Sequence, residues 1–333
     1  MNITKVIKAS ASGAAFALIV SLGNSVVAKE LPAGTVISKA NIDAIKNDTF
    51  EGHRVADLLT ERTEWQVRSH NLQIKLRNSE PLELDPKYTE ATKKYSKNVK
   101  YDPKTKEVIG WIAGMPFPNV SPDDPDAGAK LVWNRYLGFP VGDAINYSKF
   151  AFLLIDGNTG LERVQHWVLT RYMMKGRLTG ETVEGDGSIL SNTLLFATYP
   201  QDIKGLGTFT TRYDSPKVED QWAYIKSMRR IRRLSGGSWM DPIGGTDQLN
   251  DDVENWNARP SWYNGFKLVG KRWILAIAHT SAGKGKSTRG SWNNVADSKK
   301  NTMEEFPYVD LKTAPYWNPN AEWEPKEVYI RLN

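Results

Sequence analysis

Apolar and polar residues alternate along most of the chain beyond residue 98, and this alternation predicts β-strands. Two of the strands are joined around Gly157 and Asn158, which are typical residues of a hairpin turn. Most connections are too short for crossover helices, so we expect sequential antiparallel pairing into one large curved sheet. The expected strands lie within 72–76, 98–114, 148–156, 160–178, 189–200, 207–214, 221–234, 267–279 and 324–333.

Helical periodicity marks shorter stretches, most of them near the N-terminus. Ser38 is placed to cap the first helix, which runs through Ile42 and Ile45. In the second expected helix, 51–70, apolar residues recur at helical spacing, and charged residues form the face exposed to solvent. The helices should pack on one face of the sheet, so the pattern predicts a mainly β, α+β fold. The other expected helices span 51–70, 86–97 and 127–138.

Residues 1–28 have the three parts of a secretory signal peptide. Lys5 and Lys8 give a positive start, the stretch 9–22 carries no charge, and small residues precede Lys29. The uncharged stretch is too short for a comfortable membrane span. We therefore expect export, with cleavage near Ala28–Lys29 and a single soluble domain over 29–333.

Composition narrows the chemistry of the exported chain. None of the 333 residues is cysteine, which excludes disulfides, thiol catalysis and a lipid anchor on cysteine. The leader contains two lysines and no acid, so its removal lowers the net charge from +6 to +4. That excess is small for a nucleic-acid binder, and export separates the protein from the nucleic acid of the cytoplasm.

The run 229–233 places four arginines within five positions. If 222–234 is one strand, Arg230 and Arg232 share a face with Trp222, Tyr224 and Met228. One interpretation pairs the arginines with nearby acids as structural charge partners. Another has Arg230 and Arg232 meet an anionic lipid headgroup at the mouth of a cavity. The candidate charge partners are Asp247, Asp251, Asp252 and Glu254.

Motifs for metals, phosphates and hydrolysis are missing from the sequence. The four histidines have no zinc spacing, and the acids at 247–254 do not follow the spacing of an EF-hand. The chain has no GxSxG motif, and the fragment GKGKST at 283–288 lacks the upstream glycine of a phosphate loop. We expect no metal, no cofactor and no catalytic residue.

Aromatic residues are crowded between 222 and 273. Most of them suit an ordinary core, but a cavity for an acyl chain would draw on the same residue types. Each methylene that such a cavity buries contributes about 0.8 kcal/mol. The candidate ligand-binding residues are Trp222, Tyr224, Met228, Arg230, Arg232, Trp239, Trp262 and Trp273.

The stretch 221–279 resembles the core of a bacterial periplasmic family, domain of unknown function 1329. The segments LPAGTVISKANIDAIKN and AGAKLVWN are also similar to it. The resemblance implies a half-open antiparallel barrel of the LolA/LolB-like lipoprotein-carrier type, with a helical plug and an apolar cavity. It also implies a partner among inner-membrane exporters of the resistance-nodulation-division class. It carries over no catalytic residue.

Members of that family usually continue beyond the point where this chain ends. We therefore expect the domain to lack its C-terminal strands and to leave a sheet edge unpaired near the C-terminus. The leading hypothesis is a non-enzymatic periplasmic binder or carrier of lipid-like, hydrophobic molecules. One alternative is an enzyme that modifies envelope polymers with acids of 247–254 as acid and base. Another is an adaptor that binds an exporter through its surface.

Overall fold

The computed structural model of the protein describes most of the chain from residue 28 onward. The predicted leader, apart from Ala28, lies outside the described residues, as do Trp239 and the basic loop 283–288. For Glu254 the described part is the backbone. The described residues are 28–138, 142–178, 180–234, 240–243, 245–279, 309–311, 316, 318–319 and 321–332.

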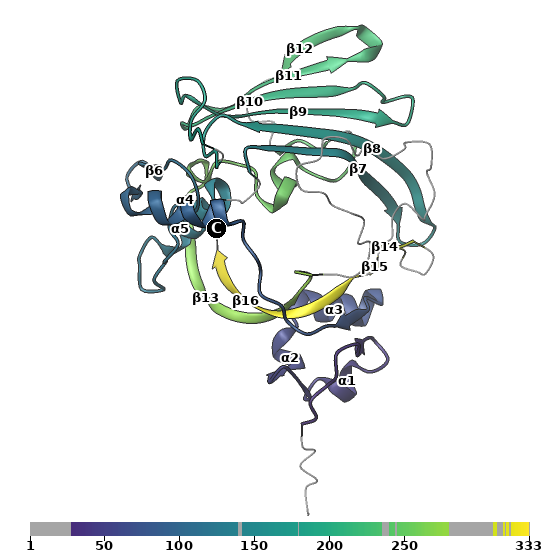
Figure 1. The fold of residues 1–333 in the computed structure, drawn as a ribbon. Coiled ribbons are helices and arrows are strands. Elements are labelled where there is room, and N and C mark those ends of the chain that lie inside the picture. Colours follow the sequence, from purple (N-terminus) through teal and green to yellow (C-terminus); the bar gives the residue numbers. More distant parts are fainter. Residues whose placement is uncertain are drawn as a thin grey trace, which may run out of the picture.

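A six-stranded antiparallel sheet forms the upper layer of the molecule in Figure 1. Its strands follow one another in space as they do in sequence, which confirms the predicted sequential pairing for this part of the chain. In the turn after the first strand, Asp156 Oδ1 accepts hydrogen bonds of 2.8 Å from the backbone N–H groups of Asn158 and Thr159. The strands are β7 (Ala144–Asp156), β8 (Gly160–Met173), β9 (Ile189–Tyr199), β10 (Gly207–Tyr213), β11 (Asp220–Ile225) and β12 (Arg230–Leu234).

The prediction of one strand over 222–234 is wrong, because the chain reverses inside it. A short 3-10 turn, η2 (Lys226–Met228), follows β11, and Arg229 then takes a left-handed backbone conformation with φ of 49°. β12 returns beside β11, with Arg230 opposite Ile225 and Arg232 opposite Ala223. Residues directly opposite each other point to the same side of a sheet, so both arginines lie on the face away from Trp222 and Tyr224.

A second sheet of four strands lies below the first in Figure 1, with the order β1-β4-β16-β13. The expectation of one large sheet is therefore wrong. β4 and β16 pair in parallel, so the expectation of antiparallel pairing throughout is wrong as well. Neither strand order returns on itself, and both sheets are open. The strands are β1 (Val36–Ile37), β4 (Ile74–Leu76), β13 (Lys267–Ala276) and β16 (Glu322–Leu332).

The C-terminal strand β16 has neighbours on both sides over part of its length. It pairs with β13 from Glu324 to Leu332, and with β4 at Glu322 and Trp323. From Glu324 to Leu332, the described residues provide no second neighbouring strand for β16. The buried carboxylate of Glu324 accepts the backbone N–H of Glu80 at 2.9 Å and contacts His279 Nδ1 at 2.6 Å. The first contact joins the C-terminal strand to the segment after β4, and the second joins it to the segment after β13.

The N-terminal helices α1 (Ile42–Ile45), α2 (Val55–Leu58) and α3 (Glu61–His70) pack below the second sheet (Figure 1). The prediction of one helix over 51–70 is wrong at its start and in its middle. Glu51 and Gly52 both have positive φ and form the turn of a small hairpin between β2 (Thr49–Phe50) and β3 (His53–Arg54). Thr60 then interrupts the helix and caps α3, since its Oγ1 accepts the N–H of Thr63 at 3.0 Å.

The remaining predicted elements are confirmed, but the predicted cap of α1 by Ser38 is wrong, because Asn41 is its N-cap residue and Ser38 Oγ donates to Asn41 Oδ1 instead. The small hairpin of β5 (Lys100–Asp102) and β6 (Glu107–Ile109) turns after Asp102, and α5 (Ala127–Leu137) ends at Gly138. Gly128 of α5 lies against β13, where an added Cβ would meet Phe266 O at 2.4 Å. The other elements are α4 (Pro86–Tyr95), η1 (Ser96–Asn98), η4 (Asn250–Asn255), η5 (Pro260–Trp262), β14 (Val309–Asp310) and β15 (Asn318–Pro319).

Two apolar cores support the sheets. The first joins α1, α2 and α3 to the second sheet through residues such as Phe50, Leu58 and Leu275. The second joins α5 to the region around Trp111 and Leu190. Across the described ranges, no helix combines the length and the apolar character needed to cross a membrane.

Candidate functional site

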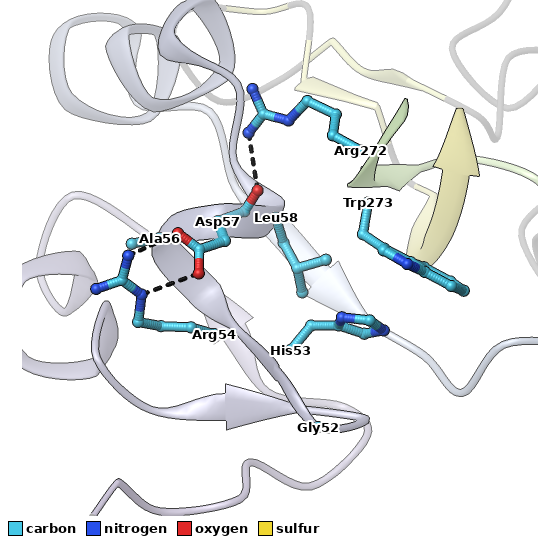
Figure 2. A pocket seen from close by; sticks show the side chains of 8 residues that line it. All are labelled: Gly52, His53, Arg54, Ala56, Asp57, Leu58, Arg272 and Trp273. Atoms are coloured by element: carbon cyan, nitrogen blue, oxygen red, sulfur yellow. Dashed lines mark hydrogen bonds and ion pairs between the residues drawn. The ribbon is translucent and has the colours of Figure 1, made fainter. Parts of the chain in front are cut away.

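An open surface pocket of about 450 Å³ lies where the β2–β3 hairpin and α2 meet β13. Figure 2 shows its side chains, with Trp273 reaching from β13 toward His53 of the hairpin. The Glu51–Gly52 turn makes this meeting possible, because it folds β3 back and directs His53 toward the sheet. The pocket is lined by Gly52, His53, Arg54, Ala56, Asp57, Leu58, Arg272 and Trp273.

Two stacked rings form the apolar wall of this pocket. The centroids of His53 and Trp273 lie 4.3 Å apart with an angle of 28° between the planes. The indole is still 41% exposed, whereas Leu58 beside it is buried in the first core. An aromatic ring that remains partly exposed in a pocket is a surface on which a flat or aliphatic group can pack.

Two guanidinium groups flank the rings. Arg54 is paired with Asp57 through Nη2–Oδ1 and Nε–Oδ2 contacts of 2.6 and 3.1 Å. The pairing holds the pKa of Asp57 below its usual value, chiefly through the hydrogen bond from Arg54. Arg272 donates from Nη2 to two backbone carbonyls, Asp57 O at 2.8 Å and Leu59 O at 3.0 Å.

The pocket therefore has an apolar wall and a net positive charge, because its two guanidinium groups share one carboxylate, that of Asp57. Arg54 and Asp57 cancel each other, and Arg272 is fixed by carbonyls, which keep its charge in place without cancelling it. This arrangement suits an amphiphilic molecule, whose apolar part packs on Trp273 while an anionic group lies near Arg272.

The inner face of the six-stranded sheet, the face that carries Leu169 and Arg212, holds two small adjoining cavities of about 50 Å³ each. Arg171 and Arg212 line both, and Asn257 from the segment after η4 closes them. Tyr136 of α5 lines one, and its hydroxyl is buried with no hydrogen-bond partner in the described structure. Each cavity has room for only a few waters, so neither is large enough for an acyl chain.

Contacts of two arginines hold the segment 249–263 against β10 and β6. Arg212 pairs with Glu219 at 2.7 Å and donates to Asn257 Oδ1 at 2.8 Å. Arg259 is 3% exposed, pairs with Glu107 and lies 5.1 Å from the ring centroid of Trp133. Charged groups, and not an apolar lining alone, thus fill the space over the inner face.

The structure does not bring the predicted ligand-binding residues together. Trp273 lies in the pocket of Figure 2, on the second sheet. Trp222 and Tyr224 lie on the outer face of the six-stranded sheet, Met228 lies in the η2 turn, and Arg230 and Arg232 lie on the inner side of its edge strand. Trp262 donates from Nε1 to Pro216 O at 3.0 Å.

The acids near 250 do not pair with the arginine run among the described residues. Arg233 pairs instead with Asp220. Asp251 accepts the hydroxyl of Tyr263 at 2.5 Å and the N–H of Asn257 at 3.2 Å, which ties the 249–263 segment to itself. Asp252 accepts the N–H of Leu249. The physical reason is distance along the sheet, since these acids pack near β10 and α5 while the run forms the edge strand.

Burial and the hydrogen bond to Asp251 raise the pKa of Tyr263. Asp251 therefore serves as a hydrogen-bond acceptor within the segment 249–263. Across the described ranges, no group of three His, Asp or Glu side chains is arranged to hold a metal ion.

Sequence reasoning did not select His53 or Arg272 as site residues. The signal available for His53 was Gly52 before it, because glycine readily adopts the positive φ of a turn. For Arg272 the available signal was its position next to Trp273, on a strand at the edge of its sheet.

The family model described as "Protein of unknown function (DUF1329)" matches residues 36–331. No curated protein matches the chain. A crystal structure of a DUF1329 family protein from Desulfovibrio piger is similar at 17% identity, over 39% of this chain and 49% of that chain, with a TM-score of 0.30.

A second similar structure is a putative outer membrane lipoprotein-sorting protein domain from Vibrio parahaemolyticus. Its identity is 18%, its TM-score is 0.29, and the match covers 41% of this chain and 49% of that one. The chain thus matches about half the length of each solved structure.

Proposed function

This chain belongs to DUF1329, a family of proteins of unknown function, and we propose that it is a non-enzymatic binding protein for amphiphilic, lipid-like molecules. The observation that carries the proposal is the pocket formed by Trp273, His53 and Arg272. It offers the two surfaces that an amphiphile with an anionic head needs, an apolar wall and a fixed cation.

The size of the pocket agrees with this ligand class. Binding sites for small molecules usually measure about 300–1,000 Å³. A volume of about 450 Å³ admits part of an acyl chain or a fused ring system, with the rest of the molecule in solvent. Six methylenes taken out of water would contribute about 5 kcal/mol before the entropic cost of binding.

In this proposal the protein works in the periplasm after export, and its two open sheets form a half-open barrel of the LolA-like type. An inner-membrane exporter of the resistance-nodulation-division class is the proposed partner, either to receive the bound molecule or to deliver it. The predicted leader and the family membership support this setting.

Mass spectrometry of organic extracts from the purified, exported protein tests the proposal. We expect an amphiphile to be recovered repeatedly, and a fluorescent fatty acid to bind after its removal. Trp273→Ala should weaken that binding by about tenfold, because the ligand loses one face of the aromatic wall. Arg272→Gln should weaken binding of the fatty acid more than binding of the corresponding neutral alcohol.

Trp65→Ala is a matched control. Trp65 is 44% exposed and also lies beside a histidine and an arginine, at ring distances of 4.3 Å from His70 and 4.8 Å from Arg62, yet it is not part of the pocket. It should leave binding unchanged. Recovery of no amphiphile together with no binding of the fluorescent fatty acid would end the proposal, as would equal losses in the Trp65 and Trp273 variants.

A further inference from the structure

The β11–β12 hairpin, at the edge of the six-stranded sheet, carries charge that the fold does not neutralise (Figure 1). Five cations and one carboxylate lie between residues 220 and 234, which leaves a net charge of +4. The carboxylate of Asp220 is already paired with Arg233. Within the described residues, four further exposed cationic side chains of the hairpin make no hydrogen bond or ion pair: Lys226, Arg229, Arg230 and Arg232.

The outer side of the same hairpin is mainly apolar, although Arg233 also lies there, opposite Trp222. We use the name outer apolar patch for Leu194, Phe209, Trp222, Tyr224 and Ile231. The first three lie directly opposite one another on three neighbouring strands, and Tyr224 lies opposite Ile231. Ile231 is 70% exposed, and Leu194, Phe209 and Tyr224 are between 41% and 43% exposed. Single exposed apolar residues are ordinary, but a contiguous group marks an interaction surface.

We infer that the β11–β12 hairpin docks the protein on an anionic lipid bilayer. The outer apolar patch and Met228 of the η2 turn enter the boundary between headgroups and acyl chains. Arg229 of the turn and Arg230 and Arg232 of β12 extend past these apolar side chains to the phosphate groups, as long cationic side chains do at membrane interfaces. This inference stands apart from the pocket of Trp273, which lies on the other sheet.

The combination of features favours a bilayer over other polyanions. Nucleic acid binding would use the cations but would gain nothing from an exposed isoleucine and methionine. An acidic partner protein would need carboxylates placed opposite each arginine, and the three free arginines are spread over the turn and the edge of the sheet. A bilayer supplies anionic charge and an apolar layer at once, with no fixed register.

Sedimentation with lipid vesicles tests the inference, with the exported protein after removal of its leader. We expect the protein to sediment with vesicles of phosphatidylglycerol and phosphatidylcholine in equal parts, and to remain largely in solution with phosphatidylcholine alone. Added salt should release it. Removal of the two edge cations in Arg230→Gln/Arg232→Gln, or of apolar contact in Met228→Ser/Ile231→Ser, should each weaken binding by about tenfold or more.

Two matched changes serve as controls. Arg163→Gln removes an exposed arginine from β8, and Ile109→Ser removes an isoleucine that is 56% exposed on β6. Both should bind vesicles as the native protein does. The inference is overturned if the native protein ignores the anionic vesicles or binds both vesicle types equally, or if the hairpin variants bind like the controls. Circular dichroism and the urea midpoint of each variant show whether a loss of binding comes from unfolding. The fatty-acid assay should be unaffected by the hairpin variants, which separates this test from that of the pocket.

Discussion

Replacement of Arg259 by methionine should be among the most costly single changes in this protein. The change keeps most of the aliphatic length of the side chain but removes a guanidinium that is 3% exposed. Arg259 donates from Nε to Glu107 Oε1 at 3.0 Å, from Nη2 to Glu107 Oε2, and from Nη1 to Tyr213 O at 3.3 Å. Methionine can make none of these bonds.

The size of the effect follows from these contacts. Two hydrogen bonds between charged groups are worth about 1.5–3 kcal/mol each, and the bond to the carbonyl about 1 kcal/mol. Removal of one partner of a buried ion pair costs about 3–5 kcal/mol, because the other charge is left without compensation. The side chain of Glu107 keeps 14% exposure, so some solvation returns to it. We therefore expect a loss of about 3 kcal/mol.

Urea unfolding followed by circular dichroism measures this loss, with the slope of the transition as a check that the unfolding remains cooperative. The double variant Glu107→Leu/Arg259→Met removes both charges and should be within about 1 kcal/mol of the native protein, although the single change is not. The reasoning would be refuted by a cost below about 1 kcal/mol for Arg259→Met. It would also be refuted if the double variant lost the sum of the two single effects, because the pair would then not be coupled.

Two further changes test other parts of the fold. Gly128→Ala should lower the free energy of unfolding in urea by about 1–3 kcal/mol, because its Cβ would meet Phe266 O at 2.4 Å. The exposed change Lys93→Ala on α4 is the control and should keep that free energy within about 0.5 kcal/mol of the native value. Hydrogen bonds from Tyr213 and then Arg233 lower the pKa of Asp220 to about 2 from an ordinary value of 3.8. The folded form therefore gains stability from this carboxylate above about pH 4 and loses it as the pH falls toward 2. An NMR titration of the Asp220 carboxyl should show this midpoint, and Arg233→Gln should raise it; a midpoint near 3.8 in the native protein would contradict the pairing.

The fold could be predicted from sequence wherever local chemistry decides. Alternation and turn residues located the strands of the six-stranded sheet, and Gly138 marked the end of α5. The reversal at Arg229 was missed because the run has no glycine or proline at its turn, and arginine rarely adopts a left-handed backbone. The pairing of β4 with β16 could not be read from periodicity, because nothing local specifies a partner so far away in the chain.

Only part of the candidate site could be predicted from the sequence, because its other contacts also join segments that are distant in the chain. Trp273 was selected because it belongs to the aromatic residues crowded between 222 and 273, which suit a cavity for an acyl chain. Its partner His53 is brought to it by a hairpin turn that the sequence analysis interpreted as the start of a helix. The arginines at 230 and 232 were assigned to the face of Trp222, and the reversal of the chain moved them to the other side of the sheet. A single misjudged turn thus changed which residues share a surface.

The contact between Glu80 and Glu324 spans 244 positions of the chain. Closing a loop of that length costs about 5 kcal/mol of chain entropy, and contacts between such distant segments slow folding. A polypeptide that emerges into its compartment from the N-terminus must therefore hold Ile74 and Leu76 without their final neighbour until almost all of the remaining chain has arrived. During that interval a chaperone or a protease would find β4 as an open edge, and the competition between them would set how much of the newly made protein survives.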